Sequence, residues 1–174
     1  DRGSKSYQVI SPGKGKGFAN YYSPVRIDGS NYIAIKTTLY NPPEFVSIDT
    51  RSGSEKRIHV PGYMYPYHIT SGNMNLVWVE FQNDPRWANR NYSVVKILDM
   101  RTNITKQLSW KSRYMSAAIS PDGRSVAVTE NTPENRNNMV ILNAATGKIL
   151  RSIPVPDNAY LQRPQWSAGG NEIT

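Results

Sequence analysis

The sequence predicts an all-β fold, and three observations lead to this prediction: its composition, its turn residues and an internal repeat. Hydrophobic residues make up 38% of the 174 residues, and 11 Tyr, 4 Trp, 12 Gly and 12 Pro favour short strands joined by tight turns. Four related segments recur along the chain, and each reads as a short strand, a Gly-containing turn and a second strand. None of these segments has the 3.6-residue period of an amphipathic helix.

The period of the repeat indicates the architecture. Taking Ile27, Ile69, Ile119 and Trp166 as equivalent positions gives spacings of 42, 50 and 47 residues, the length of a four-stranded propeller blade. The sequence therefore predicts about three and a half β-propeller blades of four antiparallel strands each, in a ring that is incomplete in this chain. We expect the end of a preceding blade or a linker at 1–20, blades at 21–62, 63–112 and 113–158, and the start of a further blade at 159–174.

Within each blade the third strand is the clearest. The runs 45–49, 94–99 and 139–143 are apolar, and each precedes a polar turn and a return strand ending near Ile58, Leu108 or Ile153. Second strands alternate, so that Val126 and Val128 would face the core between blades. Tight turns are expected where glycine supplies a positive φ, at Asp28-Gly29, Asp122-Gly123 and Thr146-Gly147.

Two segments carry a family resemblance. Ser120-Pro121-Asp122-Gly123-Arg124 is followed by Asn143-Ala144-Ala145-Thr146-Gly147-Lys148, and Asp49-Thr50-Arg51-Ser52-Gly53 matches the second of these again. They resemble the S-P-D-G-(K/R) repeat of TolB-like propellers, which also occurs in the propeller of prolyl oligopeptidase-type enzymes. The resemblance covers roughly residues 20–174 and is degenerate in the first two blades. In that family the motif makes the turn between the two inner strands, so it carries over no binding residue.

Charge and composition exclude some classes of function. The net charge is +8, but the 21 Lys and Arg are scattered, so we do not expect a nucleic-acid partner. The run Gly13-Lys14-Gly15-Lys16-Gly17 lacks the spacing of a phosphate-binding loop and is predicted to be a flexible connection. No apolar run is long enough for membrane insertion, and no signal peptide pattern is visible. Both ends look cut, so we expect a fragment of a larger protein.

The predicted blades have two different edges. The connections from second to third strands, at 39–44, 81–91 and 131–137, share one edge with the crossings between blades, which we call the connection face. The opposite edge carries the S-P-D-G turns and is called the turn face. Long loops on a rigid scaffold usually carry binding groups. The candidate ligand-binding residues, all expected on the connection face, are Tyr22, Tyr40, Tyr65, Arg86, Trp87, Tyr114 and Tyr160.

Aromatic side chains interspersed with charge suit a peptide or glycan ligand, because they give a large contact area at low entropic cost. The alternative is that the tyrosines pack between blades and only point their hydroxyl groups to water. No catalytic or cofactor-binding residue is predicted, and the only two histidines, His59 and His68, have no third metal ligand beside them in sequence. No G-x-S-x-G segment is present for a serine hydrolase.

Two functions remain open. The first is a non-catalytic binding or scaffold domain of a bacterial cell-envelope protein, placed in the periplasm or envelope by the resemblance alone. Its partners would be a protein, peptide or glycan, together with the remaining blades or domains of the same polypeptide. The second is the gating propeller of a serine or zinc peptidase whose catalytic domain lies outside this chain. A third possibility, a small protein that closes its ring by self-association, predicts a dimer.

Overall fold

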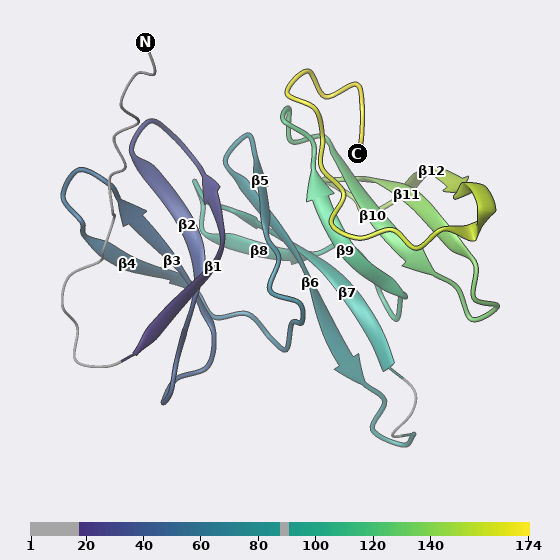
Figure 1. Ribbon diagram of the computed structural model, residues 1–174, viewed down its shortest axis with the longest axis horizontal. Helices are drawn as coiled ribbons and strands as arrows, with labels where there is room; N and C mark the ends of the chain where they lie inside the picture. Colours follow the sequence, from purple (N-terminus) through teal and green to yellow (C-terminus); the bar gives the residue numbers. More distant parts are fainter. Residues whose placement is uncertain (1–17, 88–90) are drawn as a thin grey trace, which may run out of the picture.

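The structure is a computed structural model that describes residues 18–87 and 91–174, and it consists of three four-stranded antiparallel sheets (Figure 1). The predicted fold of four-stranded propeller blades is therefore confirmed. The segment 1–17, which contains the predicted flexible connection, lies outside the described residues.

The first sheet holds β1 (Ala19–Arg26), β2 (Asn31–Thr38), β3 (Glu44–Asp49) and β4 (Glu55–His59). The second holds β5 (Thr70–Gly72), β6 (Asn75–Asn83), β7 (Asn91–Asp99) and β8 (Ile104–Gln107), and the third holds β9 (Tyr114–Ile119), β10 (Ser125–Asn131), β11 (Asn137–Asn143) and β12 (Ile149–Pro154).

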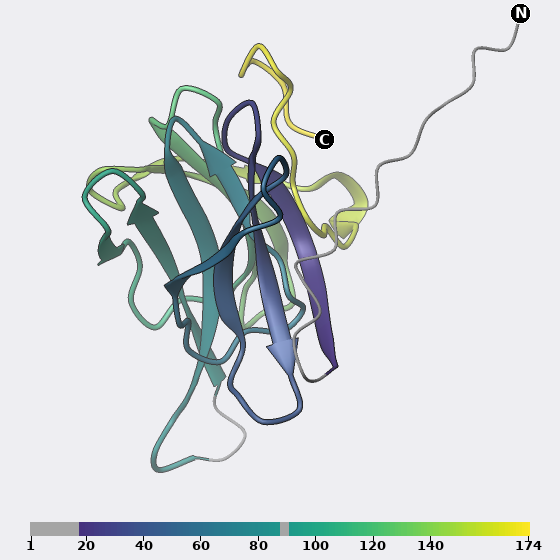
Figure 2. The ribbon, with the colours of Figure 1, turned by 90° about the vertical axis from the view of Figure 1, so that its left-hand side faces the viewer.

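Each sheet is a meander whose strands pair in chain order, and β1, β5 and β9 are the innermost strands. Figure 1 shows the three sheets side by side in chain order, and Figure 2, seen from the side of the first sheet, shows them one behind another. A short 3-10 turn, η1 (Pro156–Asn158), follows β12, and among the described residues no helix is long and apolar enough to cross a membrane. The last residues form a narrow hairpin in which Gln165 and Thr174 exchange two backbone hydrogen bonds of 2.8 and 2.9 Å.

The final hairpin repeats the turn of the third sheet. In the S-P-D-G turn the Ser120 Oγ accepts a hydrogen bond from the Ser125 N–H, and the backbone N–H of Gly123 donates to the Ser120 carbonyl. The same two bonds recur at Ser167, whose Oγ accepts from the Glu172 N–H and whose carbonyl accepts from Gly170. The C-terminal hairpin is thus closed by the same two hydrogen bonds as the turn between β9 and β10.

The second sheet is the centre of the core because it is buried on both faces. From β6, Leu76 and Trp78 pack against the first sheet, whereas Val77 and Val79 pack against the third. This is why β6 has a continuous apolar run rather than the alternation of a half-exposed strand. On the third sheet Val126 and Val128 face this core, as their alternation predicts.

The structure differs from the expected turns and strands at three places. Gly29 does not have a positive φ; instead the Asp28 Oδ1 accepts from the N–H groups of Ser30 and Asn31 and closes that turn. Gly123 and Gly147 have φ values of 74° and 73°, as expected. The innermost strand expected around Ile69 begins only at Thr70, since Pro66 has no N–H and the backbone of Ile69 bonds to the Ser23 side chain. The loop expected at 81–91 is shorter than predicted, because β6 and β7 remain paired as far as Asn83 and Asn91.

Hydroxyl side chains tie each innermost strand to the next. The Ser23 Oγ accepts from the Ile69 N–H at 3.1 Å and donates to the Ile69 carbonyl at 3.3 Å. One blade later the Thr70 Oγ1 accepts from the Ile119 N–H at 3.0 Å and donates to a carbonyl of β9 at 3.5 Å. The Ser116 Oγ then accepts from the Arg163 N–H at 3.2 Å. These three residues stand 47 and 46 residues apart, so one contact is repeated once per blade.

A buried acid holds the crossing between β4 and β5, residues 60–69, against the second sheet. Glu80 is 4% exposed, and its carboxylate accepts hydrogen bonds from Trp78 Nε1 at 2.7 Å and from the Gly62 N–H at 2.9 Å. Its second oxygen lies 2.7 Å from Lys96 Nζ. Burial alone would raise the pKa of Glu80, but the hydrogen bonds from Lys96, Trp78 and Gly62 bring it below its ordinary value of 4.5. The crossing is therefore fixed by a satisfied, charged group inside the interface between two blades.

Replacing Thr70 by Val keeps the shape of the side chain but leaves the Ile119 N–H without its acceptor. We expect the free energy of unfolding to fall by about 1–2 kcal/mol, measured by chemical denaturation. Thr105→Val on β8 is the control, because the Thr105 hydroxyl forms no hydrogen bond with a described residue and lies on an outermost strand. Equal losses in the two variants would mean that the hydroxyl contact between strands contributes nothing.

Replacing Glu80 by Gln removes the ion pair with Lys96, and we expect a loss of about 2 kcal/mol at pH 7. A carboxyl whose pKa is lowered by folding stabilises the protein fully above its unfolded pKa, near 4.5, and loses this contribution as the pH falls through its folded pKa. Denaturation curves recorded at decreasing pH should therefore show the difference between wild type and Glu80→Gln shrinking below pH 4.5. A difference that stays constant down to low pH, or that the exposed-site control Glu172→Gln reproduces, would contradict this assignment.

Candidate functional site

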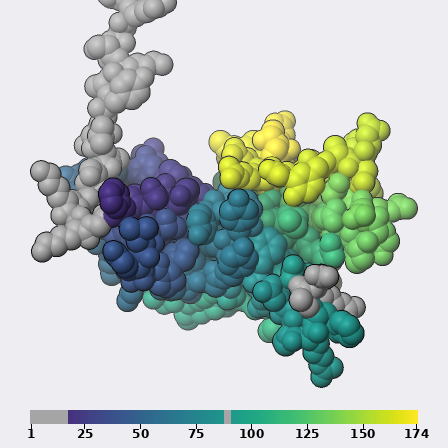
Figure 3. Space-filling view, turned by 60° about the horizontal axis from the view of Figure 1, so that its bottom comes forward, coloured from purple at the N-terminus to yellow at the C-terminus, as the bar shows by residue number. Residues whose placement is uncertain are grey.

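The connection face carries large exposed aromatic side chains. It forms the lower edge of Figure 1, and Figure 3 brings this edge forward and shows the β6–β7 hairpin projecting from it. Arg86 is exposed on the same hairpin, where its N–H donates to the Asp84 Oδ1 at 2.8 Å. The exposed aromatic residues among those predicted to bind are Tyr40 at 89%, Tyr65 at 69%, Trp87 at 63%, Tyr160 at 57% and Tyr22 at 41%.

These residues come from different elements rather than from one cluster. Tyr40 lies between β2 and β3, Tyr65 in the crossing to β5, Trp87 in the β6–β7 connection and Tyr160 after η1. The crossing from β4 to β5 is held against β6, because the Phe81 N–H donates a hydrogen bond to the Tyr63 carbonyl at 2.7 Å. Tyr22 differs from the prediction, because it lies inside β1, where it pairs with Ile35 of β2, and not in a connection or crossing. It packs on Tyr67, with ring centroids 5.2 Å apart, so it belongs partly to the inter-blade contact.

Tyr114 has a different environment from the other predicted residues. It is 5% exposed and belongs to the core cluster between the second and third sheets. Burial, with a smaller effect of Glu130, raises the pKa of its hydroxyl group. The alternative interpretation, in which a tyrosine packs between blades, therefore describes Tyr114, because β9 begins inside the interface rather than at its rim.

The innermost strands line a pocket that the pattern of long loops did not predict. Its volume is about 470 Å³, and it lies where β1, β5, β9 and the segment 163–166 approach one another. Its polar lining includes the ties described above, Ser23 and Thr70, together with Ser71, whose Oγ donates to the Arg26 carbonyl at 3.1 Å. We call it the axial pocket. The sequence contained a partial signal for it, because two of the three hydroxyl residues that recur at blade spacing, Ser23 and Thr70, line the pocket.

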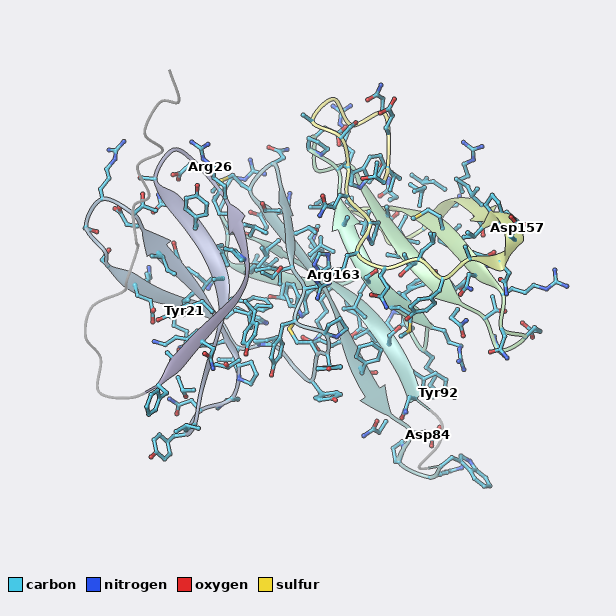
Figure 4. The ribbon with its side chains drawn as sticks, viewed as in Figure 1. Tyr21, Arg26, Asp84, Tyr92, Asp157 and Arg163 are labelled. Carbon is cyan, nitrogen blue, oxygen red and sulfur yellow. The ribbon has the colours of Figure 1, made fainter. Side chains whose placement is uncertain are left out.

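Three basic side chains line the axial pocket: Arg26, His68 and Arg163. Figure 4 shows Arg163 near the middle of the molecule and Arg26 beside the tip of the β1–β2 hairpin. Burial, reinforced by the positive charge of Arg163, lowers the pKa of His68 from its ordinary value of 6.5 and so favours the neutral imidazole. Its Nε2 atom is buried and has no hydrogen-bond partner among the described residues.

The described residues contain no group of three or more His, Cys, Asp or Glu side chains arranged to hold a metal ion. His59 and His68 lie in different environments: His59 packs against Phe45 and Trp78, with ring centroids 5.8 and 5.2 Å away, whereas His68 lines the axial pocket. The described residues bring exposed aromatic rings to the connection face and guanidinium groups to the axial pocket.

No protein-family model matches the chain, and no curated protein sequence matches it significantly. Solved structures do match. TolB from Acinetobacter baumannii aligns with 99% of this chain at a TM-score of 0.66 and 18% identity, and the chain spans 40% of that structure. The β-propeller domain of the trilobed protease from Pyrococcus furiosus aligns with 90% of the chain at a TM-score of 0.55 and 14% identity, and 48% of it is spanned.

A puromycin-hydrolyzing peptidase from Mycobacterium tuberculosis aligns with 86% of the chain at a TM-score of 0.56 and 15% identity, and the chain spans 24% of it. At such identities the similarity concerns the fold and not the site. The chain has the fold of a TolB-like β-propeller and spans less than half the length of the structures that it matches.

Proposed function

We propose that the chain is a non-catalytic binding or scaffold domain of a bacterial cell-envelope protein, and that its ligand is a protein, peptide or glycan. The observation that carries this proposal is the set of exposed aromatic side chains on the connection face. Tyrosine and tryptophan side chains offer a large contact area at low entropic cost and keep a hydrogen-bonding group at their tip. Tyr and Trp are also the residues that most often dominate the binding energy of an interface.

The scaffold supports this use. The second sheet is buried on both faces and the crossing to it is fixed by Glu80, so the loops project from a rigid base. A rigid base lowers the entropic cost of ordering the loops on binding. The periplasm or cell envelope as location rests on the resemblance of the S-P-D-G turns to TolB-like propellers, and it remains part of the proposal.

A second candidate is the gating propeller of a peptidase whose catalytic domain lies outside this chain. It is favoured by the similarity to the β-propeller domain of a protease and to a puromycin-hydrolyzing peptidase. The two candidates differ in what adjoins these blades in the full gene product. A serine-hydrolase or zinc-peptidase domain there favours gating, and further blades or a short accessory domain behind a secretion signal favour binding.

The binding proposal predicts that aromatic side chains of the connection face carry affinity. Peptide and glycan arrays probed with the purified protein identify ligands, and titration calorimetry then compares variants. We expect Trp87→Ala and Tyr40→Ala each to weaken binding, by about 2 kcal/mol for a residue at the centre of the contact. Leu150→Ala is the control, because Leu150 is also exposed, at 55%, but lies on the outermost strand β12. Unchanged affinity in both aromatic variants would show that the connection face is not the binding surface.

A further inference from the structure

The axial pocket has an unbalanced charge. Arg26 and Arg163 line it, whereas no Asp or Glu side chain does. Neither arginine forms an ion pair with a described carboxylate, since the ion pairs of the described residues involve Lys36, Arg57, Lys96, Arg101 and Arg124. A cavity with positive walls and low-dielectric strands behind them concentrates its field on an anion. The lining of the axial pocket contains no carboxylate group that could bind a cation.

The hydroxyl groups in the wall are already engaged. Ser23 and Thr70 tie neighbouring strands, and Ser71 donates to the Arg26 carbonyl. The Arg26 guanidinium donates through Nε and Nη2 to carbonyls of its own turn, at 3.0 and 3.4 Å, which leaves Nη1 without a described partner. The Arg163 guanidinium forms no hydrogen bond with a described residue. The donors left for a ligand are therefore mainly guanidinium N–H groups.

The backbone of Arg163 is held in an unusual conformation. Its φ is 50°, in the left-handed region that non-glycine residues adopt uncommonly and that eight other described non-glycine residues share. The Ser116 Oγ accepts a hydrogen bond from the Arg163 N–H, and the buried Pro164 follows directly. This hydrogen bond fixes the backbone at the residue whose side chain lines the pocket.

We propose that the axial pocket binds a carboxylate group of a peptide, with Arg163 as the main contact and Arg26 as a second positive group. This proposal rests on the proposed binding function and specifies part of the ligand. A planar guanidinium matches a carboxylate through two parallel hydrogen bonds, a geometry that a neutral amide or sugar hydroxyl does not offer. The pocket volume, about 470 Å³, accommodates the end of a peptide. The carboxylate comes either from the C-terminus of the peptide or from one of its Asp or Glu side groups.

The two histidines provide a local test. His68 lines the axial pocket and His59 lies in the core beside Phe45 and Trp78, so imidazole NMR signals of the isotope-labelled protein report the pocket with an internal reference. The protein is titrated with Ala-Ala-Ala-Ala, its C-terminal amide, the amide Ala-Glu-Ala-Ala-NH2, and inorganic phosphate. We expect the His68 signals to shift with at least one carboxylate-bearing peptide and not with Ala-Ala-Ala-Ala-NH2, while His59 stays unchanged. The first and third probes distinguish a peptide terminus from an acidic side group.

Substitutions then assign the contact. We expect Arg163→Gln to weaken binding of the responding peptide by about tenfold, and Arg26→Gln to weaken it less, because Arg26 already bonds to its own turn. Arg151→Gln is the matched control: it removes the same charge from an exposed position on β12. All three residues are exposed, so thermal unfolding should show unchanged folding.

The outcomes separate this inference from the proposed function. If array peptides bind, and Trp87→Ala weakens them while Arg163→Gln does not, the connection face binds ligands and the axial proposal is wrong. If no carboxylate peptide shifts His68, or if the amide peptide shifts it equally, the axial proposal is overturned whatever the arrays show. A shift with inorganic phosphate alone would also overturn it, because the pocket would then select a different anion.

Discussion

The repeated hydroxyl contact between innermost strands is the constraint on which the rest of the structure depends. An innermost strand has a free edge, and unpaired backbone groups at such an edge are costly once water is excluded. Ser23, Thr70 and Ser116 satisfy part of each edge and bind it to the next blade. Because the contact recurs once per blade, it sets three sheets and a further hairpin around a common axis. The axial pocket is the space left between strands held in this way.

The interfaces between sheets complete this arrangement. The second sheet contributes apolar side chains to both of its faces, so neither interface can open without exposing its strands. Glu80 is the one buried acid inside these contacts among the described residues, and its three donors come from the crossing and from two strands of the same sheet. A fully satisfied charge of this kind fixes one geometry of the crossing, since any shift would leave the carboxylate unpaired.

The structure has two candidate binding surfaces that differ in chemistry. The connection face offers exposed rings on loops, which can contact varied ligands, and the axial pocket offers guanidinium groups whose backbone is fixed by neighbouring strands. The structures that share this fold include TolB and the β-propeller domain of a protease, so the architecture by itself does not choose between binding and gating. The proposed functions are therefore argued from these side chains and not from the fold.

The sequence by itself determined the blade architecture, because period, turn glycines and strand alternation are local properties: the turns at Gly123 and Gly147 and the inward faces of Val126 and Val128 followed from it. It also indicated that exposed aromatic residues occur in the long connections. Only the tertiary structure decided that Tyr114 is buried, that Gly29 needs no positive φ, and that Arg26, His68 and Arg163 share one pocket. Burial and proximity between residues in different blades arise from packing of whole sheets, and no local pattern records which side chains meet there.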